Sequence, residues 1–582
     1  MATEHLLGEF PPVSTAAWKA AIARDLKGAD YDSKLMWRTE DGLAVKPFYR
    51  TGDLKGLGFL DAAPGEFPYR RGVRTTGDWR IREEIEVADA EEANRAACSA
   101  VAAGAEGIAF SSLLAESSAE LEVLLKNLDG VPVHFGRADE RLIRLLMERL
   151  NKRRRVAETS TGCDALTSAG FAADAIGAAA AGFVPFTIHG ETLGEAGATA
   201  VEEVGFALAA GVDFLAAMEE GGIAVNRAAA ALEFSFAIGS NYFFQIAKLR
   251  AFRMVWARAV ECFCGSRDAA RARIAARTCR WDKTVYDPHV NILRGTTEAM
   301  AAVLGGADLV TVAPFDACYK QPDETSRRLA RNTQLLLKHE AWLGRVADAG
   351  GGSYYIEALT DFLAQEGWKR MQEIEARGGY RKAQAEGTIA QALEGSMAAR
   401  EKAVRSRRRV FVGTNQYANP ADWALDRADP ARMNAGRRGA RIYEELRLRT
   451  EWHAAAGGKT PRVLLAEIGD VKMRIARSNF ATNFFACAGF EIATRRFKRA
   501  AEIAAADGDL IVLCSSDQEY AALVAGLMPK LKALGRTTPV MVAGLPEGAE
   551  HLAAAGIADF VHVRSNPVEV LTKWQERLGI KG

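Results

Sequence analysis

The sequence predicts an α/β protein in two units: a closed (β/α)8 barrel of the TIM-barrel class, followed by a smaller, flavodoxin-like doubly wound domain. From about residue 84 to residue 399, short apolar segments alternate with alanine-rich helical patterns, and this alternation is typical of parallel sheets. About 300 residues of it without a break favour a closed barrel, although an open sheet stays possible. The last 125 or so residues repeat strand and helix five times, which predicts the second unit.

The first 70 residues predict an arm rather than a folded domain. Ser14 can cap a helix over residues 15–27, and Gly28 can end it. The remainder up to residue 70 is rich in turn residues and cannot bury a core of its own. We therefore expect residues 1–70 to lie on another surface, either of this chain or of a partner subunit.

Composition changes predict the remaining boundaries. The barrel is expected over residues 71–396, and a polar, arginine-rich linker over 397–458. Residues 459–582 are expected to form the second domain. Because ligands of doubly wound sheets bind at the carboxyl ends of the strands, its candidate binding loops begin at Ile468, Ser515 and Gly544.

The strands themselves are predicted from short apolar runs between turn residues. The barrel strands are expected at residues 107–110, 132–135, 184–188, 233–238, 290–293 and 308–312, with helices such as 196–208 and 243–262 between them. The strands of the second domain are expected at residues 462–467, 490–494, 510–514, 540–543 and 560–563.

Composition excludes several classes of function. The chain has 75 Lys+Arg against 74 Asp+Glu, so it is not a globally basic nucleic-acid binder. The basic runs at 152–155 and 405–409 are better explained as solvated or ion-paired segments. Eight cysteines and eight histidines without metal-ligand spacing fit a reducing compartment and no metal site. With no signal peptide and no long apolar run, we expect a soluble, cytoplasmic protein that contacts neither membrane nor nucleic acid.

Few residues stand out as candidates for chemistry. His189 ends a predicted barrel strand, at the end where barrel active sites lie, and Glu191 and Glu195 follow it closely. His289 follows a proline in a turn. Any of them could act as an acid or base, yet a structural role explains each equally well. Pattern alone therefore yields a fold and no reaction.

Long stretches of the sequence resemble the methylmalonyl-CoA mutase family. The most similar segments are residues 37–49, 194–201, 293–306, 328–334 and 351–360. The resemblance extends over nearly the whole chain and implies a (β/α)8 barrel joined to a C-terminal cobalamin domain. It also implies adenosylcobalamin radical chemistry that interconverts methylmalonyl-CoA and succinyl-CoA. In that family a CoA channel runs through the barrel, and a histidine ligates cobalt from below.

Within the resemblance, the cobalamin-binding pattern is missing. The family carries Asp-x-His-x-x-Gly after the first strand of the cobalamin domain, and here the corresponding run lies within residues 469–476. Met473 stands at the cobalt-ligand position and Ala476 at the glycine, and no histidine occurs between residues 454 and 550. A thioether is a poor substitute for an imidazole tuned by a carboxylate. Ser515 and Ser516 survive, as weak evidence of a pocket for the nucleotide tail.

The barrel positions differ as well. Glu191 and Thr192 stand where catalytic members carry a tyrosine and a histidine. Ala231 and Glu233 stand where those members carry an arginine and a serine that bind CoA. A glutamate there is expected to repel the CoA phosphates. The resemblance therefore implies no catalytic, cofactor-binding or metal-binding residue in this chain.

This combination resembles the small (beta) subunit of heterodimeric methylmalonyl-CoA mutases. We expect a non-catalytic structural subunit that supports a catalytic large (alpha) subunit, with adenosylcobalamin bound in the partner. The arm would then lie on that partner. Two alternatives stay open: an independent acyl-CoA mutase with atypical cobalamin binding, and a regulatory module that senses CoA esters.

Overall fold

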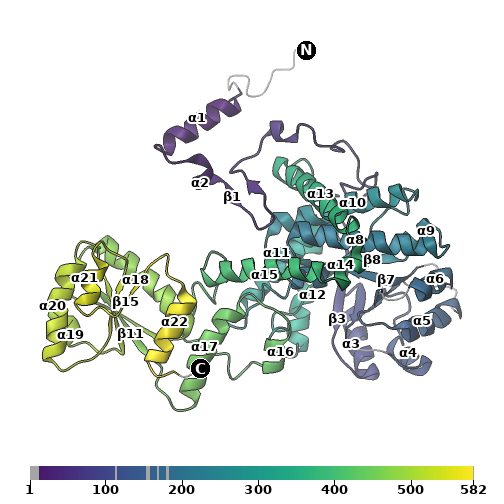
Figure 1. The fold of residues 1–582 in the computed structure, drawn as a ribbon. Coiled ribbons are helices and arrows are strands. Elements are labelled where there is room, and N and C mark those ends of the chain that lie inside the picture. Colours follow the sequence, from purple (N-terminus) through teal and green to yellow (C-terminus); the bar gives the residue numbers. More distant parts are fainter. Residues whose placement is uncertain (1–11, 112–114, 153–157, 167–168, 179–181, 581–582) are drawn as a thin grey trace.

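The computed structural model describes residues 12–111, 115–152, 158–166, 169–178 and 182–580 (Figure 1). These residues form a two-stranded antiparallel sheet, a closed parallel barrel and a five-stranded parallel sheet. The barrel and the five-stranded sheet confirm the predicted fold class. In Figure 1 the five-stranded sheet and its helices lie to one side of the barrel.

The barrel consists of strands β3 to β10 in chain order, closed by the pairing of β10 with β3. Every neighbouring pair is parallel. The strands are β3 (Arg80–Ile85), β4 (Gly107–Phe110), β5 (Val133–Phe135), β6 (Thr159–Asp164), β7 (Phe183–His189), β8 (Leu232–Ile238), β9 (Ile274–Thr278) and β10 (Leu309–Thr311).

Helices surround the barrel. They are α3 (Ala90–Ala102), α4 (Ser118–Leu124), α5 (Glu140–Lys152), α6 (Ala169–Ala178), α7 (Gly190–Glu195), α8 (Ala200–Glu220), α9 (Val225–Ala230), α10 (Tyr242–Cys262), α11 (Val290–Leu304) and α12 (Glu324–His339). A further long helix, α13 (Tyr354–Glu375), packs on both α8 and α10. The α8–α13 approach requires glycine, because a Cβ at Gly367 would lie 2.4 Å from a Val204 side-chain carbon.

Two kinds of error separate the prediction from the barrel. The predicted strand at 290–293 is wrong, since these residues form the first turn of α11. Three strands, β3, β6 and β9, were not predicted, because their inward-facing positions are polar or charged and hide the apolar alternation. The predicted helix at 196–208 begins at Ala200, where Thr199 caps it.

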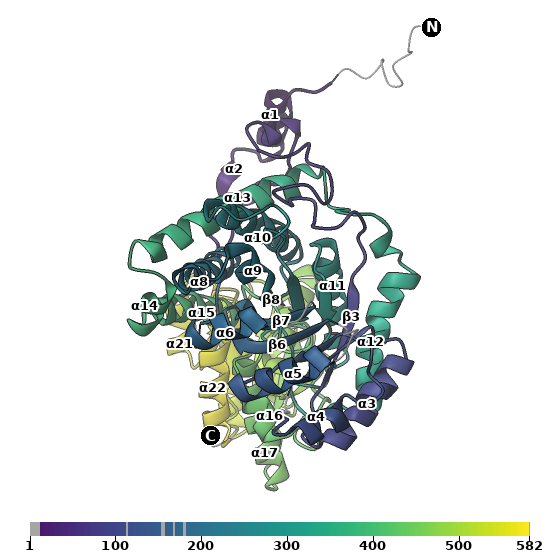
Figure 2. The same cartoon turned by 90° about the vertical axis from the view of Figure 1, so that its right-hand side faces the viewer.

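The arm contains α1 (Thr15–Asp25), α2 (Tyr31–Leu35), the β1–β2 hairpin (Trp37–Arg38 and Ala44–Val45) and the 3-10 helix η1 (Thr51–Leu54). Ser14 caps α1 through its side chain, as predicted, and no residue of α1 is buried. Figures 1 and 2 both show α1 standing away from the barrel. From the hairpin on, the arm contacts the barrel, where Asp41 accepts a hydrogen bond from the Val201 backbone at the start of α8.

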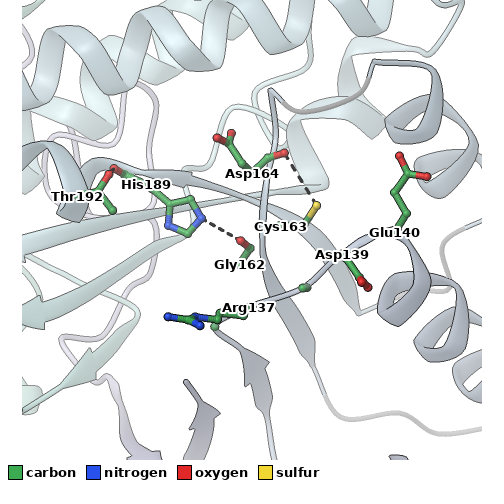
Figure 3. Close-up of a pocket in the computed structure, with 10 residues that line it drawn as sticks. Arg137, Asp139, Glu140, Gly162, Cys163, Asp164, His189 and Thr192 are labelled. Atoms are coloured by element: carbon green, nitrogen blue, oxygen red, sulfur yellow. Dashed lines mark hydrogen bonds between the residues drawn. The ribbon is translucent and has the colours of Figure 1, made fainter. Parts of the chain in front are cut away.

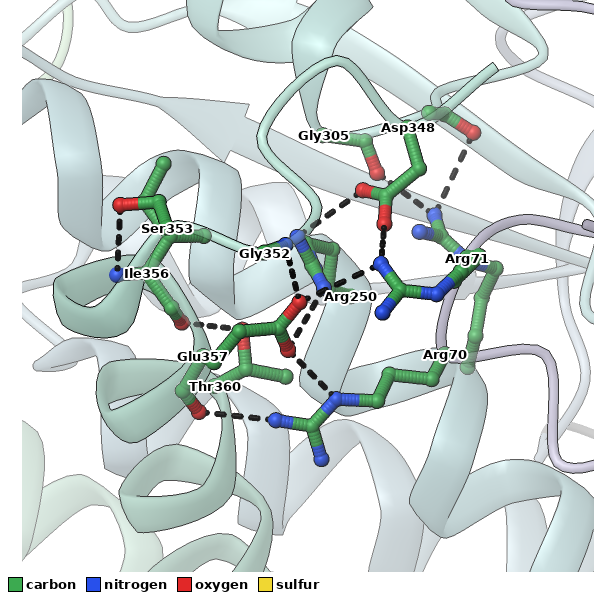
Figure 4. A network of polar contacts seen from close by, with 12 residues as sticks. Arg70, Arg71, Arg250, Gly305, Asp348, Gly352, Ser353, Ile356, Glu357 and Thr360 are labelled. Atoms are coloured by element: carbon green, nitrogen blue, oxygen red, sulfur yellow. Dashed lines mark hydrogen bonds and ion pairs between the residues drawn. The ribbon is translucent and has the colours of Figure 1, made fainter. Parts of the chain in front are cut away.

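A buried ion network joins the end of the arm to the barrel helices (Figure 4). Glu357, at the start of α13, accepts from Arg70 at 2.7 Å and from Arg250 of α10 at 3.0 Å. Asp348 pairs with Arg250 at 2.9 Å and with Arg71 at 3.0 Å. The side chains of Arg70, Arg250 and Glu357 are fully buried. The base of the arm is therefore buried against the helices around the barrel, whereas α1 is not.

The C-terminal sheet has the strand order β12-β11-β13-β14-β15. This is a doubly wound order in which the crevice between β11 and β13 is the topological switch point. The strands are β11 (Arg462–Glu467), β12 (Glu491–Arg496), β13 (Leu510–Cys514), β14 (Val540–Ala543) and β15 (Asp559–Val561). Helices α18 (Val471–Phe485) and α22 (Pro567–Arg577) cover one face. Helices α19 (Ala500–Ala504), α20 (Tyr520–Ala533) and α21 (Ala549–Ala554) cover the other.

The segment between the two units is folded. It contains α14 (Tyr380–Ala385), α15 (Thr388–Arg405), α16 (Pro430–Asn434) and α17 (Arg441–Ala455), so the predicted start of the linker at 397 lies inside α15. Tyr443 of α17 packs in one apolar cluster with Trp281 of the barrel and Phe484 of α18. Arg409, from the basic run at 405–409, pairs with Asp282 at 3.0 Å. Residues 153–155 of the other basic run lie outside the described residues.

Candidate functional site

A charged network fills the amino-terminal half of the barrel. At its centre the carboxylate of Glu233 on β8 is fully buried. One oxygen lies 3.3 Å from Nη1 of Arg82 on β3, and the other accepts from Nε of Arg273 at 2.9 Å. Burial alone would raise the pKa of Glu233, but Arg273 and Arg82 lower it to about 2. The carboxylate is therefore ionised and compensated by two guanidinium groups.

Other inward-facing side chains extend this network across the barrel. Nδ1 of His134 on β5 lies 2.8 Å from Oγ of Ser160 and 3.7 Å from Oε1 of Glu233. Burial and the charge of Arg82 lower the pKa of His134 to about 3, so its contact with Glu233 is not an ion pair. Arg273 also pairs with Glu158 at 3.1 Å, and Arg80 reaches the same carboxylate.

A second ion pair lies nearer the carboxyl ends of the strands. Nη2 of Arg277 on β9 is 2.7 Å from Oε2 of Glu84 on β3. Burial favours the neutral carboxyl group, but Arg277 outweighs it and the net pKa of Glu84 is lowered. Salt bridges thus link β3 to β8 at one level and to β9 at a second level nearer the carboxyl ends.

Above these pairs, an open pocket of about 670 Å³ lies at the carboxyl ends of β5, β6 and β7 (Figure 3). Its walls carry Gly136, Arg137, Ala138, Asp139, Glu140, Gly162, Cys163, Asp164, His189 and Thr192. His189 points at the Gly162 carbonyl, 3.0 Å from Nε2, and its Nδ1 lies 2.7 Å from Glu191. Burial lowers the pKa of His189, but Glu191 more than offsets this and raises it to about 9. Both nitrogens of the imidazolium are therefore hydrogen-bonded to acceptors of the chain itself.

The sequence-predicted barrel residues therefore have structural partners. The Thr192 hydroxyl donates to the His189 carbonyl at 2.8 Å, and Glu191 holds the His189 ring. Ala231 ends α9 and is buried. Glu195 accepts from the Arg280 backbone at 2.8 Å. His289 starts α11, and its ring centroid lies 5.2 Å from that of Phe315, on a different part of the barrel rim from His189.

The equivalent position in the C-terminal domain is the crevice at the carboxyl ends of β11 and β13. Met473 lies half-buried in the first turn of α18. Asp470 accepts a hydrogen bond from the Met473 backbone at 2.8 Å and so caps this helix. Its carboxylate is thereby committed to the helix start rather than to an imidazole.

Two side chains from the β13–α20 segment occupy the crevice itself. Glu519 accepts from the hydroxyls of Ser515 and Ser516, and the buried Tyr520 donates to the Ala543 carbonyl at 2.7 Å. These residues do not fit cobalamin, because the position of the lower ligand offers no imidazole and the crevice is filled by the chain's own side chains. Within the described part of the chain, no group of three or more His, Cys, Asp and Glu could hold a metal ion.

Comparison with known proteins identifies the family of this chain. The family model described as methylmalonyl-CoA mutase matches residues 38–117 and 173–455, which include all eight barrel strands except β5 and β6. The chain belongs to the methylmalonyl-CoA mutase family. This confirms the resemblance found in the sequence.

Individual relatives resolve the family further. The chain is 37% identical over 621 aligned residues to the methylmalonyl-CoA mutase small subunit of Porphyromonas gingivalis, covering 99% of each chain. It is 33% identical to the small subunit of Streptomyces virginiae, over 99% of this chain and 98% of that one. The match to the large subunit of Streptomyces virginiae is 30% identical over 79% of this chain and 69% of that one. The full-length similarity is thus to small subunits of the methylmalonyl-CoA mutase family.

In this mutase-family chain, sequence reasoning missed the residues that form the barrel network and the residue that lies in the C-terminal crevice. Arg82, Arg273 and His134 were not singled out, although a charged residue inside a short strand is a signal for an interior ion pair. Glu519 was missed because its role depends on a turn that brings it back onto Ser515. Among the described helices, none is long and apolar enough to cross a membrane.

Proposed function

We propose that this chain is the non-catalytic small (beta) subunit of an adenosylcobalamin-dependent methylmalonyl-CoA mutase. The complete enzyme would interconvert methylmalonyl-CoA and succinyl-CoA in the cytoplasm. A catalytic large (alpha) subunit would bind both the substrate and adenosylcobalamin, and this chain would bind neither. Its own residues maintain a barrel and a doubly wound domain that the partner subunit packs against.

The observation that carries the proposal is the network around Glu233. A CoA chain that threaded this barrel would have to displace Glu233, Arg82 and Arg273 together. The physical reason for excluding CoA differs from the repulsion of its phosphates that the sequence led us to expect. Glu233 does not present a free negative charge to the CoA phosphates, because two guanidinium groups neutralise it. Exclusion is therefore steric, and the two salt bridges hold the obstruction in position.

The arm supports the proposed partnership. No residue of α1 is buried, and Trp18 is 45% exposed where it stacks on Phe48 at 5.0 Å. Trp37, at 50% exposed, lies edge-on to Phe244 of α10. Exposed aromatic side chains are enriched where proteins meet. We propose that the large subunit covers this aromatic surface.

Co-expression tests the proposal. A tagged copy of this chain is produced with and without a methylmalonyl-CoA mutase large subunit from the same organism. We expect the two chains to co-purify, and mutase activity to need the large subunit. A variant that lacks residues 12–30 should lose most of the co-purification while its barrel stays folded. Trp452→Ala, an exposed tryptophan on α17 far along the chain from the arm, is the control.

The two alternatives predict other results. An independent mutase would bind cobalamin tightly as the isolated chain, detected by the cobalamin absorption spectrum at micromolar cofactor. A regulatory module would give a saturable heat on titration with CoA esters. Either result, or failure to co-purify with the large subunit, would overturn the proposal.

A further inference from the structure

Four hydrogen-bond donors converge on one carboxylate at the switch point of the C-terminal sheet. Glu519 Oε2 accepts from Ser515 Oγ at 2.7 Å, Ser516 Oγ at 2.6 Å and the Ser516 backbone at 3.2 Å. The Asp470 backbone N–H reaches the same carboxylate at 3.1 Å. Ser515 is fully buried and Ser516 is 8% exposed. Two hydroxyls and two peptide N–H groups thus point at a single negative group.

These donors come from two loops that the sheet topology brings together. Ser515 and Ser516 follow β13, whereas Asp470 follows β11, its neighbour in the sheet. Gly469 permits the close approach, since its φ is +80° and a Cβ there would lie 2.4 Å from the Glu519 oxygens. The backbone at this position is therefore shaped around an oxyanion.

The charge of Glu519 is matched to these donors. The Ser515 and Ser516 hydroxyls, together with the backbone N–H groups, lower the pKa of Glu519 to about 2. Among the described residues, no lysine, arginine or histidine forms a salt bridge with Glu519. Neutral donors that hold an anion without a counter-ion are the same chemistry that binds phosphate in protein loops.

We propose that the Ser515-Ser516 loop and the Gly469-Asp470 turn form an oxyanion site whose resident anion is the chain's own Glu519, which keeps phosphate groups out of this crevice. A phosphate oxygen could accept the same hydrogen bonds as the carboxylate, but not while the Glu519 side chain remains there. The inference concerns this domain alone and does not depend on pairing with a large subunit.

Inorganic phosphate is the probe that tests it, titrated calorimetrically into the full-length chain at constant ionic strength. Unaltered chain should give no saturable heat. Glu519→Ala should bind one phosphate per chain, because the four donors lose their internal acceptor. Adding Ser516→Ala to that variant should weaken phosphate binding about tenfold, since one of the donors is gone. Glu547→Ala, which removes an exposed acid from the loop after β14, should behave like the unaltered chain.

Two results would overturn the inference. One is saturable phosphate binding by the unaltered chain equal to that of Glu519→Ala, which would mean that Glu519 does not close the site. The other is absence of phosphate binding by a folded Glu519→Ala variant. Should that variant not fold, Glu519→Ser takes its place, because serine shortens the side chain and still suits the start of α20.

Discussion

The barrel and the C-terminal domain are closed at opposite ends of their strands and by different means. In the barrel, Glu233 on β8 is joined by salt bridges to Arg82 on β3 and to Arg273, which directly precedes β9. In the C-terminal domain, one half-exposed carboxylate on a loop, Glu519, fills the crevice. A closure that is part of the core stabilises the fold, whereas a closure on a loop can be removed without unfolding it.

The largest expected effect is at the centre of the barrel. Glu233→Ala leaves the buried Arg82 without its carboxylate and Arg273 with Glu158 alone, and breaking such a buried pair costs about 3–5 kcal/mol. Denaturant unfolding should show this loss, while Glu220→Ala at the exposed end of α8 should show almost none. Replacing all three residues together by Leu and Met should restore most of the stability. If Glu233→Ala were as stable as the unaltered chain, the barrel network would contribute no more to stability than Glu519 does in the C-terminal domain.

The network at the base of the arm offers a second core closure for comparison. Glu357→Ala removes the shared partner of Arg70 and Arg250, and we expect a loss of about 3 kcal/mol. Limited proteolysis should then cut between residues 56 and 76, because the arm loses its attachment. If the cleavage pattern did not change, the network would not be what holds the base of the arm.

The mouth of the barrel should respond to pH. The pKa of His189 is raised to about 9 by Glu191, so its stabilising effect is complete below the unfolded value near 6.5 and is lost as pH rises through 9. Glu191→Gln should bring the pKa of His189 down and cost about 1–2 kcal/mol at pH 7. NMR titration of the His189 imidazole in the unaltered chain and in Glu191→Gln measures the two pKa values. A His189 pKa unchanged by the substitution would contradict the pairing.

The smallest effect is expected from restoring one ligand in the C-terminal domain. Met473→His alone should leave the cobalamin spectrum unchanged on mixing, because Asp470 caps α18 and Glu519 still fills the crevice. Combining Met473→His with Glu519→Ala tests whether one carboxylate is the main remaining obstacle. Tight cobalamin binding by the single variant would show that the crevice is not closed.

Much of the fold follows from the sequence because its apolar strands are buried on both faces. Strands β4, β11, β13 and β14 begin and end where their apolar runs do. Strand β3 was not recognised, since Arg82 and Glu84 interrupt its pattern and their salt-bridge partners are more than 140 residues away along the chain. The replaced positions at Thr192 and Met473 could be read from the sequence, but the closure by Glu233 and Glu519 depends on tertiary contacts.

The mutual support within the barrel network constrains how this sequence can change. With Arg82 and Arg273 in place, a neutral small residue at position 233 leaves the buried Arg82 without its carboxylate, and either arginine lost alone leaves Glu233 with one guanidinium partner instead of two. Each single substitution in this network therefore destabilises the fold unless the other residues of the network have already been replaced. Because the three side chains depend on one another, no series of individually neutral substitutions removes these paired charges from the barrel.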